Sequence, residues 1–122
     1  MKLAAVLALV ALTSATPVHA QGLGIPGVAT GKPMVFTYRC PTGKPFTVSY
    51  WNGDNGQSFA LVPIDGKPQL LVSLMSASGV RYAAGSVIWW TKGRNADLYH
   101  SGSMDPDSGQ VKPVSCTGTP AS

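Results

Sequence analysis

Ser78 and Lys92 carry the side chains of this sequence that could do chemistry together: a hydroxyl that donates and accepts hydrogen bonds, and an ammonium ion that donates them. Gly85 lies seven residues from each of them along the chain. If the chain turns back at Gly85, Ser78 faces Lys92 across a hairpin. If the stretch is one strand, a rise of ~3.3 Å per residue separates them by roughly 45 Å. Any shared function of these two residues therefore depends on a turn at Gly85.

Ser78 could also serve as the nucleophile of a hydrolase, with His100 as its base and Asp97 as the group that orients the base. His100 is the only histidine after residue 20, and Ser78 does not lie in a G-x-S-x-G motif. Asp97 and His100 are three residues apart, so on a strand they face opposite sides. We therefore expect no such triad, and we interpret His100 as a residue of the barrel surface with no special role.

Other enzyme classes find little support in the sequence. Glycoside hydrolysis usually needs two carboxylates in one cleft, and the chain has five Asp and no Glu. The spacings typical of metal ligands and of phosphate-binding loops do not occur in the sequence. We expect a protein that is not an enzyme and binds no metal or cofactor, which leaves recognition as its function.

Short segments of alternating apolar and polar residues predict the strands that must position Ser78 and Lys92. The expected strands cover residues 34–40, 46–51, 58–64, 69–75, 80–83, 87–91, 96–100 and 111–116. Turn residues separate them, as at Asn52 to Gly56, and no segment has a helical period of useful length. Eight short strands predict an all-β fold, either a small antiparallel barrel or a sandwich.

Cys40 and Cys116 are the only cysteines, and they are 76 residues apart. In an exported chain such a pair most often forms a disulfide. Cys40 ends the first expected strand and Cys116 ends the last, so in a barrel the bond would join the two strands that close it. In the chain-entropy model a loop of this length adds up to about 4.5 kcal/mol of stability. The predicted disulfide is therefore structural.

The N-terminal residues 1–20 have the pattern of a secretory signal peptide. Lys2 precedes an apolar run from Leu3 to Leu12, and Ala20 ends a cleavage site of small residues. We expect the mature chain to be soluble and to lie outside the cytoplasm. Residues 21–33, with four glycines and two prolines, predict a flexible lead. Residues 34–116 are then the domain, and residues 117–122 are a C-terminal tail.

The charge of the expected mature chain is modest, about +3, from eight Lys and Arg and five Asp. Proteins that bind nucleic acid usually gather their basic residues in a stripe, and here they are spread along the sequence. They are Lys32, Arg39, Lys44, Lys67, Arg81, Lys92, Arg94 and Lys112. We therefore expect no nucleic-acid partner.

An ordered set of motifs runs through residues 34–116. S-G-x-x-Y begins at Ser78, and Y-x-x-G-x-x-x-aromatic-W-x-K-G follows from Tyr82 to Gly93. F-x-V-x-Y-x-N lies upstream, from Phe46 to Asn52. Together with Ala96, Leu98 and the two cysteines, this order resembles the family of bacterial inhibitors of C-type lysozyme, which has membrane-anchored and periplasmic forms. S-G-x-x-Y alone would be weak, but the ordered set is fairly specific.

The resemblance implies an eight-stranded antiparallel β-barrel, closed by the Cys40–Cys116 disulfide, that presents the Ser78 loop to the cleft of a C-type lysozyme. By likeness, the lysozyme-binding residues are Ser78, Gly79, Tyr82, Lys92 and Gly93. Gly79 would let the loop tip approach closely, and Tyr82 would brace the loop from the barrel wall.

The chemistry of lysozyme suits such a pair of side chains. Lysozyme works with one carboxyl protonated and another ionised. The Ser78 hydroxyl donates and accepts, so it can satisfy that mixed pair. The Lys92 ammonium would add a charge-assisted hydrogen bond to the ionised partner. Peptidoglycan could then no longer enter the cleft.

Departures from the family pattern refine this interpretation. No cysteine follows the apolar run, so we expect the chain to group with the periplasmic forms, without a membrane anchor. Trp89 stands where many members of the family carry phenylalanine. C-type lysozymes are generally basic, so long-range steering is unfavourable and affinity must come from the loop.

Two alternatives stay open at this point. One is a non-inhibitory periplasmic barrel that binds glycan through an exposed tryptophan, or has a structural role in the envelope. The other is the hydrolase that uses Ser78. The sequence predicts no oligomeric state.

Overall fold

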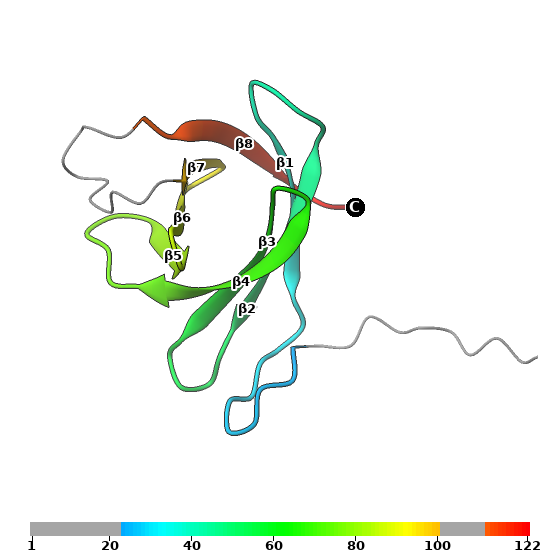
Figure 1. Cartoon of the computed structure of the whole chain (residues 1–122). Coiled ribbons are helices and arrows are strands. Elements are labelled where there is room, and N and C mark those ends of the chain that lie inside the picture. The colour runs from blue at the N-terminus through cyan, green and yellow to red at the C-terminus, as the bar shows by residue number, and fades with distance from the viewer. Residues whose placement is uncertain (1–22, 101–111) are drawn as a thin grey trace, which may run out of the picture.

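Each strand of the computed structural model pairs antiparallel with the next one along the chain, and the eighth pairs with the first (Figure 1). The result is the predicted closed β-barrel. The structure describes residues 23–100 and 112–122, so the predicted signal peptide lies outside the described residues. The strands are β1 (Met34–Arg39), β2 (Phe46–Asn52), β3 (Ser58–Ile64), β4 (Lys67–Leu74), β5 (Val80–Ala84), β6 (Val87–Lys92), β7 (Asn95–His100) and β8 (Val114–Pro120).

Strand β8 lies later in the chain than the sequence predicts. It was expected at residues 111–116, but it runs from Val114 to Pro120. To close the barrel, β8 must pair with both β7 and β1. Leu98 of β7 lies opposite Val114, and Phe36 of β1 lies opposite Pro120. Residues 117–120 therefore belong to the barrel, and the prediction of a tail over 117–122 is corrected there.

The N-terminal lead is attached to the barrel more firmly than its composition suggests. Thr30 forms a bridge with Gly53. The Asp54 backbone N–H donates to the Ala29 carbonyl at 2.9 Å, and the Asp54 carboxylate accepts from the Ala29 N–H at 3.2 Å. These contacts tie residues 29 and 30 to the connection between β2 and β3. They involve mostly main-chain groups, which leave no pattern in the sequence.

Trp89 lies at the centre of the barrel with none of its surface exposed. Its indole Nε1 donates a hydrogen bond to the Tyr50 hydroxyl at 2.7 Å, and the hydroxyls of Tyr50 and Tyr38 share another at 2.7 Å. The polar atoms of these three large side chains are thus satisfied inside an apolar interior. The other inward residues are Val48, Ala60, Val62, Ile64, Leu71, Tyr82, Val87, Ala96 and Cys116.

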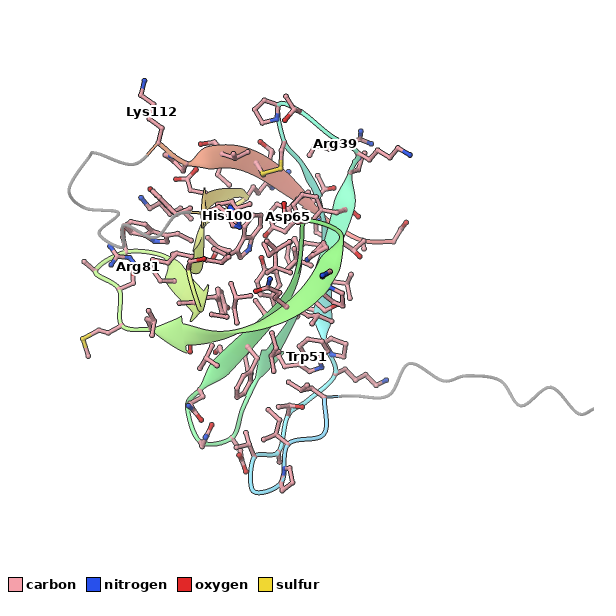
Figure 2. The ribbon with its side chains drawn as sticks, viewed as in Figure 1. Arg39, Trp51, Asp65, Arg81, His100 and Lys112 are labelled. Carbon is pink, nitrogen blue, oxygen red and sulfur yellow. A yellow bond between two sulfur atoms is a disulfide. The ribbon has the colours of Figure 1, made fainter. Side chains whose placement is uncertain are left out.

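The Cys40–Cys116 disulfide is present, as predicted, with a Cα–Cα distance of 4.2 Å. Arg39 pairs with Thr117 in the β1–β8 ladder, so the two cysteines face each other one step further along. Figure 2 shows the bond beside β8. The disulfide therefore reinforces the two strands whose pairing closes the barrel.

The buried tyrosines predict how stability depends on pH. Burial raises the pKa of Tyr38, Tyr50 and Tyr82 above their ordinary value of 10.0. The folded state therefore resists ionisation that the unfolded chain accepts, so stability is full below pH 10 and is lost as the pH rises above it. We expect the urea midpoint to be constant from about pH 7 to 9 and to fall above about pH 10. In Tyr50→Phe the fall should be shallower, and an unchanged slope would contradict the assignment.

Removal of the disulfide tests how the barrel is closed. The double change Cys40→Ser with Cys116→Ser should lower the free energy of unfolding by about 2–4 kcal/mol, because the unfolded chain regains the freedom of a long loop. Urea denaturation measures the loss, and reduced wild-type protein is the matched control. A urea midpoint equal to that of the oxidised wild type would show that the pairing of β1 with β8 does not depend on the disulfide.

Candidate binding site at one end of the barrel

The turn on which the site depends is present. Strands β5 and β6 form a hairpin in which Ala84 pairs with Val87 and Val80 pairs with Thr91. Gly85 and Ser86 make the two-residue connection, and Gly85 has a φ of +54°, as such tight hairpin turns require. Ser78 precedes one strand and Lys92 ends the other, so both lie at the same end of the barrel. In Figure 1 the connection from β4 to β5, which carries Ser78, projects at the left.

The register of the hairpin differs by one residue from the expected one. Its centre lies between Gly85 and Ser86, so continuing the ladder places Gly79, rather than Ser78, opposite Lys92. The reason is the even, two-residue turn, whereas a turn centred on Gly85 alone would have an odd length. Ser78 lies one residue further into the loop. The two functional candidates are diagonal neighbours rather than a directly opposed pair.

Gly79 is where the loop meets β6. Its φ is +62°, and a Cβ at this position would collide with the Thr91 carbonyl oxygen and lie 3.0 Å from Lys92 Cγ. The backbone of residue 79 thus packs directly against the end of β6. A glycine is required for both reasons, since it accepts a positive φ and leaves room for the neighbouring strand.

Ser78 is exposed, and its two polar groups differ in their surroundings. Its carbonyl oxygen accepts hydrogen bonds from Trp90 Nε1 at 2.9 Å and from the Ser76 hydroxyl at 2.5 Å. Within the described ranges 23–100 and 112–122, no group bonds to the Ser78 hydroxyl. The backbone of the loop is therefore anchored while the hydroxyl remains available to a partner.

Lys92 lies with its ammonium group over the Trp90 ring, 3.8 Å from the ring centroid. The Arg81 guanidinium is 3.9 Å from the same centroid. No carboxylate of the described residues pairs with Lys92. Because an aromatic face holds a cation more weakly than a carboxylate does, this lysine can be transferred to an acidic partner.

Tyr82 and Gly93 support the site in different ways. Tyr82 faces the barrel interior, is 6% exposed and lies opposite Trp89, with its ring 5.5 Å from that of Tyr50. It therefore supports β5 from inside the barrel. Gly93 is exposed in the turn between β6 and β7, where its φ of +59° suits the reversal after Lys92.

Trp90 is the residue whose part in the site the sequence analysis missed. Its N–H bonds to the Ser78 carbonyl, and its ring lies beneath the Lys92 ammonium group. Strand alternation carried the signal: Arg81 pairs with Trp90 across the hairpin, and Lys92 follows two residues later on the same face. Beside these residues lies a pocket of about 330 Å³, whose other wall includes Asp97 and Ser115.

The hydrolase arrangement is not formed. His100 pairs with Val87 at the opposite end of β6 from Lys92, and its Nε2 lies 3.6 Å from the Asp65 carboxylate (Figure 2). Asp97 instead accepts a hydrogen bond from the Ser115 hydroxyl at 2.7 Å. Ser78, Asp97 and His100 are therefore separated, and within residues 23–100 and 112–122 no base is bonded to the serine hydroxyl.

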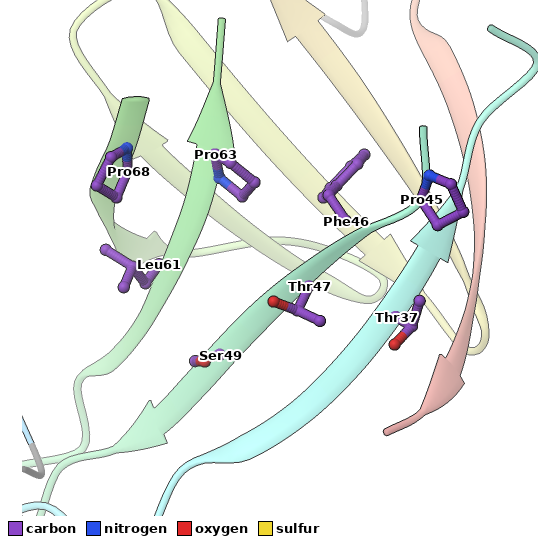
Figure 3. A pocket seen from close by; sticks show the side chains of 8 residues that line it. All are labelled: Thr37, Pro45, Phe46, Thr47, Ser49, Leu61, Pro63 and Pro68. Atoms are coloured by element: carbon purple, nitrogen blue, oxygen red, sulfur yellow. The ribbon is translucent and has the colours of Figure 1, made fainter. Parts of the chain in front are cut away.

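A larger groove, of about 510 Å³, lies on the outer face of β1 to β4 (Figure 3). It is lined by Thr37, Pro45, Phe46, Thr47, Ser49, Leu61, Pro63 and Pro68. None of these side chains is charged. In the part of the chain that the structure describes, no cluster of metal-ligating side chains occurs, and no helix is long and apolar enough to cross a membrane.

Fold and site together define a small, disulfide-closed β-barrel that presents a serine, a glycine and a lysine at one end. The family model described as membrane-bound lysozyme-inhibitor of c-type lysozyme matches residues 38–106, so the chain belongs to this family.

Two similar proteins are each named membrane-bound lysozyme inhibitor of C-type lysozyme. The one from Pseudomonas aeruginosa is 48% identical over 79 residues, which are 63% of this chain and 61% of the relative. The one from Cupriavidus necator is 43% identical over 95 residues, which are 77% of this chain and 75% of the relative. The chain thus spans less than two thirds of the first relative's length.

A solved structure shares the fold: Pseudomonas aeruginosa MliC in complex with hen egg white lysozyme. It has a TM-score of 0.63 and 33% sequence identity, and the match covers 85% of this chain and all of that one.

Gly79→Ala tests the close contact between the loop and β6. Gly85→Ala is its matched control, because both glycines have positive φ but a Cβ at Gly85 meets nothing within 4 Å. We expect Gly85→Ala to lose about 1 kcal/mol of unfolding free energy through backbone strain. Gly79→Ala should lose more, by at least about 1 kcal/mol, because of the added collision. Equal losses in urea denaturation would show that the loop does not pack on β6.

Proposed function

We propose that this protein inhibits C-type lysozyme by inserting the Ser78 loop, with Lys92 beside it, into the active-site cleft and so blocking hydrolysis of peptidoglycan. One observation carries the proposal: Ser78, whose hydroxyl has no partner among the described residues, and the exposed Lys92 both contact Trp90 at one end of a closed barrel. The family supports the partner, since both curated relatives are named inhibitors of C-type lysozyme. The related solved structure contains hen egg white lysozyme.

The energetics favour transfer of Lys92 from Trp90 to a carboxylate. A cation over an aromatic ring at an exposed site gains about 0.5–1 kcal/mol. A hydrogen bond to a charged group contributes about 1.5–3 kcal/mol. The exchange is therefore favourable once the cleft excludes water. The Ser78 hydroxyl, which has no partner among the described residues, adds its hydrogen bond without giving one up there.

The loop also offers apolar contact area to a cleft wall. Met75 is 98% exposed and Leu74 is 51% exposed, both just ahead of Ser78. Because the domain and its proposed partner are both basic, such short-range contacts must supply affinity that long-range attraction does not. We place this activity in the periplasm, where an exported inhibitor would meet a lysozyme that reaches the cell wall.

The glycan-binding alternative has lost the feature that supported it. It required an exposed tryptophan, but Trp51 and Trp90 are each 7% exposed and Trp89 is fully buried. Without an exposed aromatic platform, the described surface gives no specific reason to prefer a glycan partner.

Lysis of a cell-wall substrate by a C-type lysozyme, with increasing amounts of the protein, tests the proposal. Ser78→Ala and Lys92→Ala should each weaken inhibition by about 10-fold, a loss of about 1.4 kcal/mol, because each removes one hydrogen bond to the catalytic pair. The urea midpoint should be unchanged in Ser78→Ala, and the free energy of unfolding should fall by no more than about 0.5–1 kcal/mol in Lys92→Ala, which loses the contact with Trp90.

Ser86→Ala and Lys67→Ala are the matched controls, because both residues are exposed and lie at the opposite end of the barrel. They should inhibit like the wild type. A Ser78→Ala, Lys92→Ala double variant that inhibits fully would overturn the proposed mode of binding, and a wild-type protein without inhibition would overturn the function itself.

A further inference from the structure

Three contacts converge on the Trp90 side chain, which stands on the outer face of β6. Its indole Nε1 donates to the Ser78 carbonyl at 2.9 Å. The Lys92 ammonium and the Arg81 guanidinium lie 3.8 and 3.9 Å from its ring centroid. The ring is only 7% exposed although it points away from the core. A tryptophan that merely covered the sheet would not need to meet both proposed binding groups.

We propose that Trp90 is the positioning residue of the binding site: it fixes the Ser78 loop through its N–H and holds Lys92 through its ring, so that both groups are ordered before the partner arrives. This inference rests on the proposed function, because it concerns how the same site reaches its affinity. Because the Trp90 side chain is only 7% exposed, it acts through Ser78 and Lys92 rather than by contact with the partner.

The N–H of Trp90 acts on the loop. Ser78 follows the end of β4 and precedes β5, so no ladder hydrogen bond fixes it. Its carbonyl is anchored by Trp90 from β6 and by the Ser76 hydroxyl from within the loop. Only the first of these bonds ties the loop to the barrel. A phenylalanine at position 90 would keep the ring but lose this bond, and the loop would sample more conformations.

The ring of Trp90 acts on Lys92. A lysine in water samples many rotamers, and the loss of that freedom weakens binding. Over the ring the side chain is already confined, next to the indole whose N–H bonds to Ser78. Arg81 brings a second positive charge to the same ring, and the repulsion between the two cations opposes tight retention of Lys92. The lysine is therefore confined but readily transferred to a carboxylate.

Position 90 is the one tryptophan site that can act in this way. Trp89 faces the interior and donates its N–H to Tyr50. Trp51 is buried to the same degree as Trp90, but its Nε1 has no hydrogen-bond partner in the part of the chain that the structure describes. Trp51→Phe is therefore a matched control: it removes an indole N–H that positions nothing.

Double-mutant cycles in the lysozyme inhibition assay test the inference. Trp90→Phe should weaken inhibition about 5-fold. In the Trp90→Phe background, Ser78→Ala should weaken inhibition by only about 2-fold, instead of the about 10-fold expected in the wild type, because a loose loop no longer presents the hydroxyl. Lys92→Ala should keep its full effect there. In Trp90→Leu the effect of Lys92→Ala should also shrink. Trp51→Phe should inhibit like the wild type and leave both effects unchanged. Full, additive effects of Ser78→Ala and Lys92→Ala in both Trp90 variants would overturn the inference.

NMR of the free protein supplies a readout that needs no lysozyme. The Lys92 methylene protons next to the ammonium should be shifted upfield by the ring in the wild type and in Trp90→Phe, but not in Trp90→Leu. Unshifted protons in the wild type would contradict the inference whatever the inhibition assay shows. If the shifts are present and the wild type does not inhibit lysozyme, the proposed function fails while the ring contact stands.

Discussion

The pairing of β5 with β6 across the Gly85 and Ser86 turn is the constraint on which both the core and the binding end depend. Side chains alternate along a strand, so one register sends Trp89 inward and Trp90 outward. A slip of one residue would turn Trp90 and Lys92 toward the core and would expose Trp89 to water. The same register brings Gly79 against Thr91 and Lys92. Core packing thus enforces the geometry of the site.

The different roles of Trp89 and Trp90 follow from this register. Trp89 satisfies its N–H on Tyr50 inside the barrel, and its neighbour satisfies its N–H on the loop outside. The barrel has no free edge, because every described strand has two partners. Recognition is then left to the end loops. A rigid wall beneath a short loop limits how much freedom the loop loses when it binds.

Much of this architecture could be predicted from the sequence, and the failures have physical causes. Alternation and turn residues located the strands, and the positions of Cys40 and Cys116 on the first and last expected strands indicated the bond that joins them. The hairpin register was missed by one residue, because a glycine marks a turn without fixing whether the loop is odd or even. The extension of β8 to Pro120 depends on which strand lies beside it in space, which local patterns do not encode. The contacts of Trp90 required that register before they could be seen.

Competition with a saccharide tests most directly whether this end of the barrel fills the lysozyme cleft. A preformed complex of the protein with a C-type lysozyme can be titrated with a short oligosaccharide of N-acetylglucosamine, while its dissociation constant is followed. If the Ser78 loop and Lys92 occupy the cleft, the apparent dissociation constant should rise in proportion to the concentration of saccharide. A ternary complex, with an apparent dissociation constant that does not change as saccharide is added, would contradict the account.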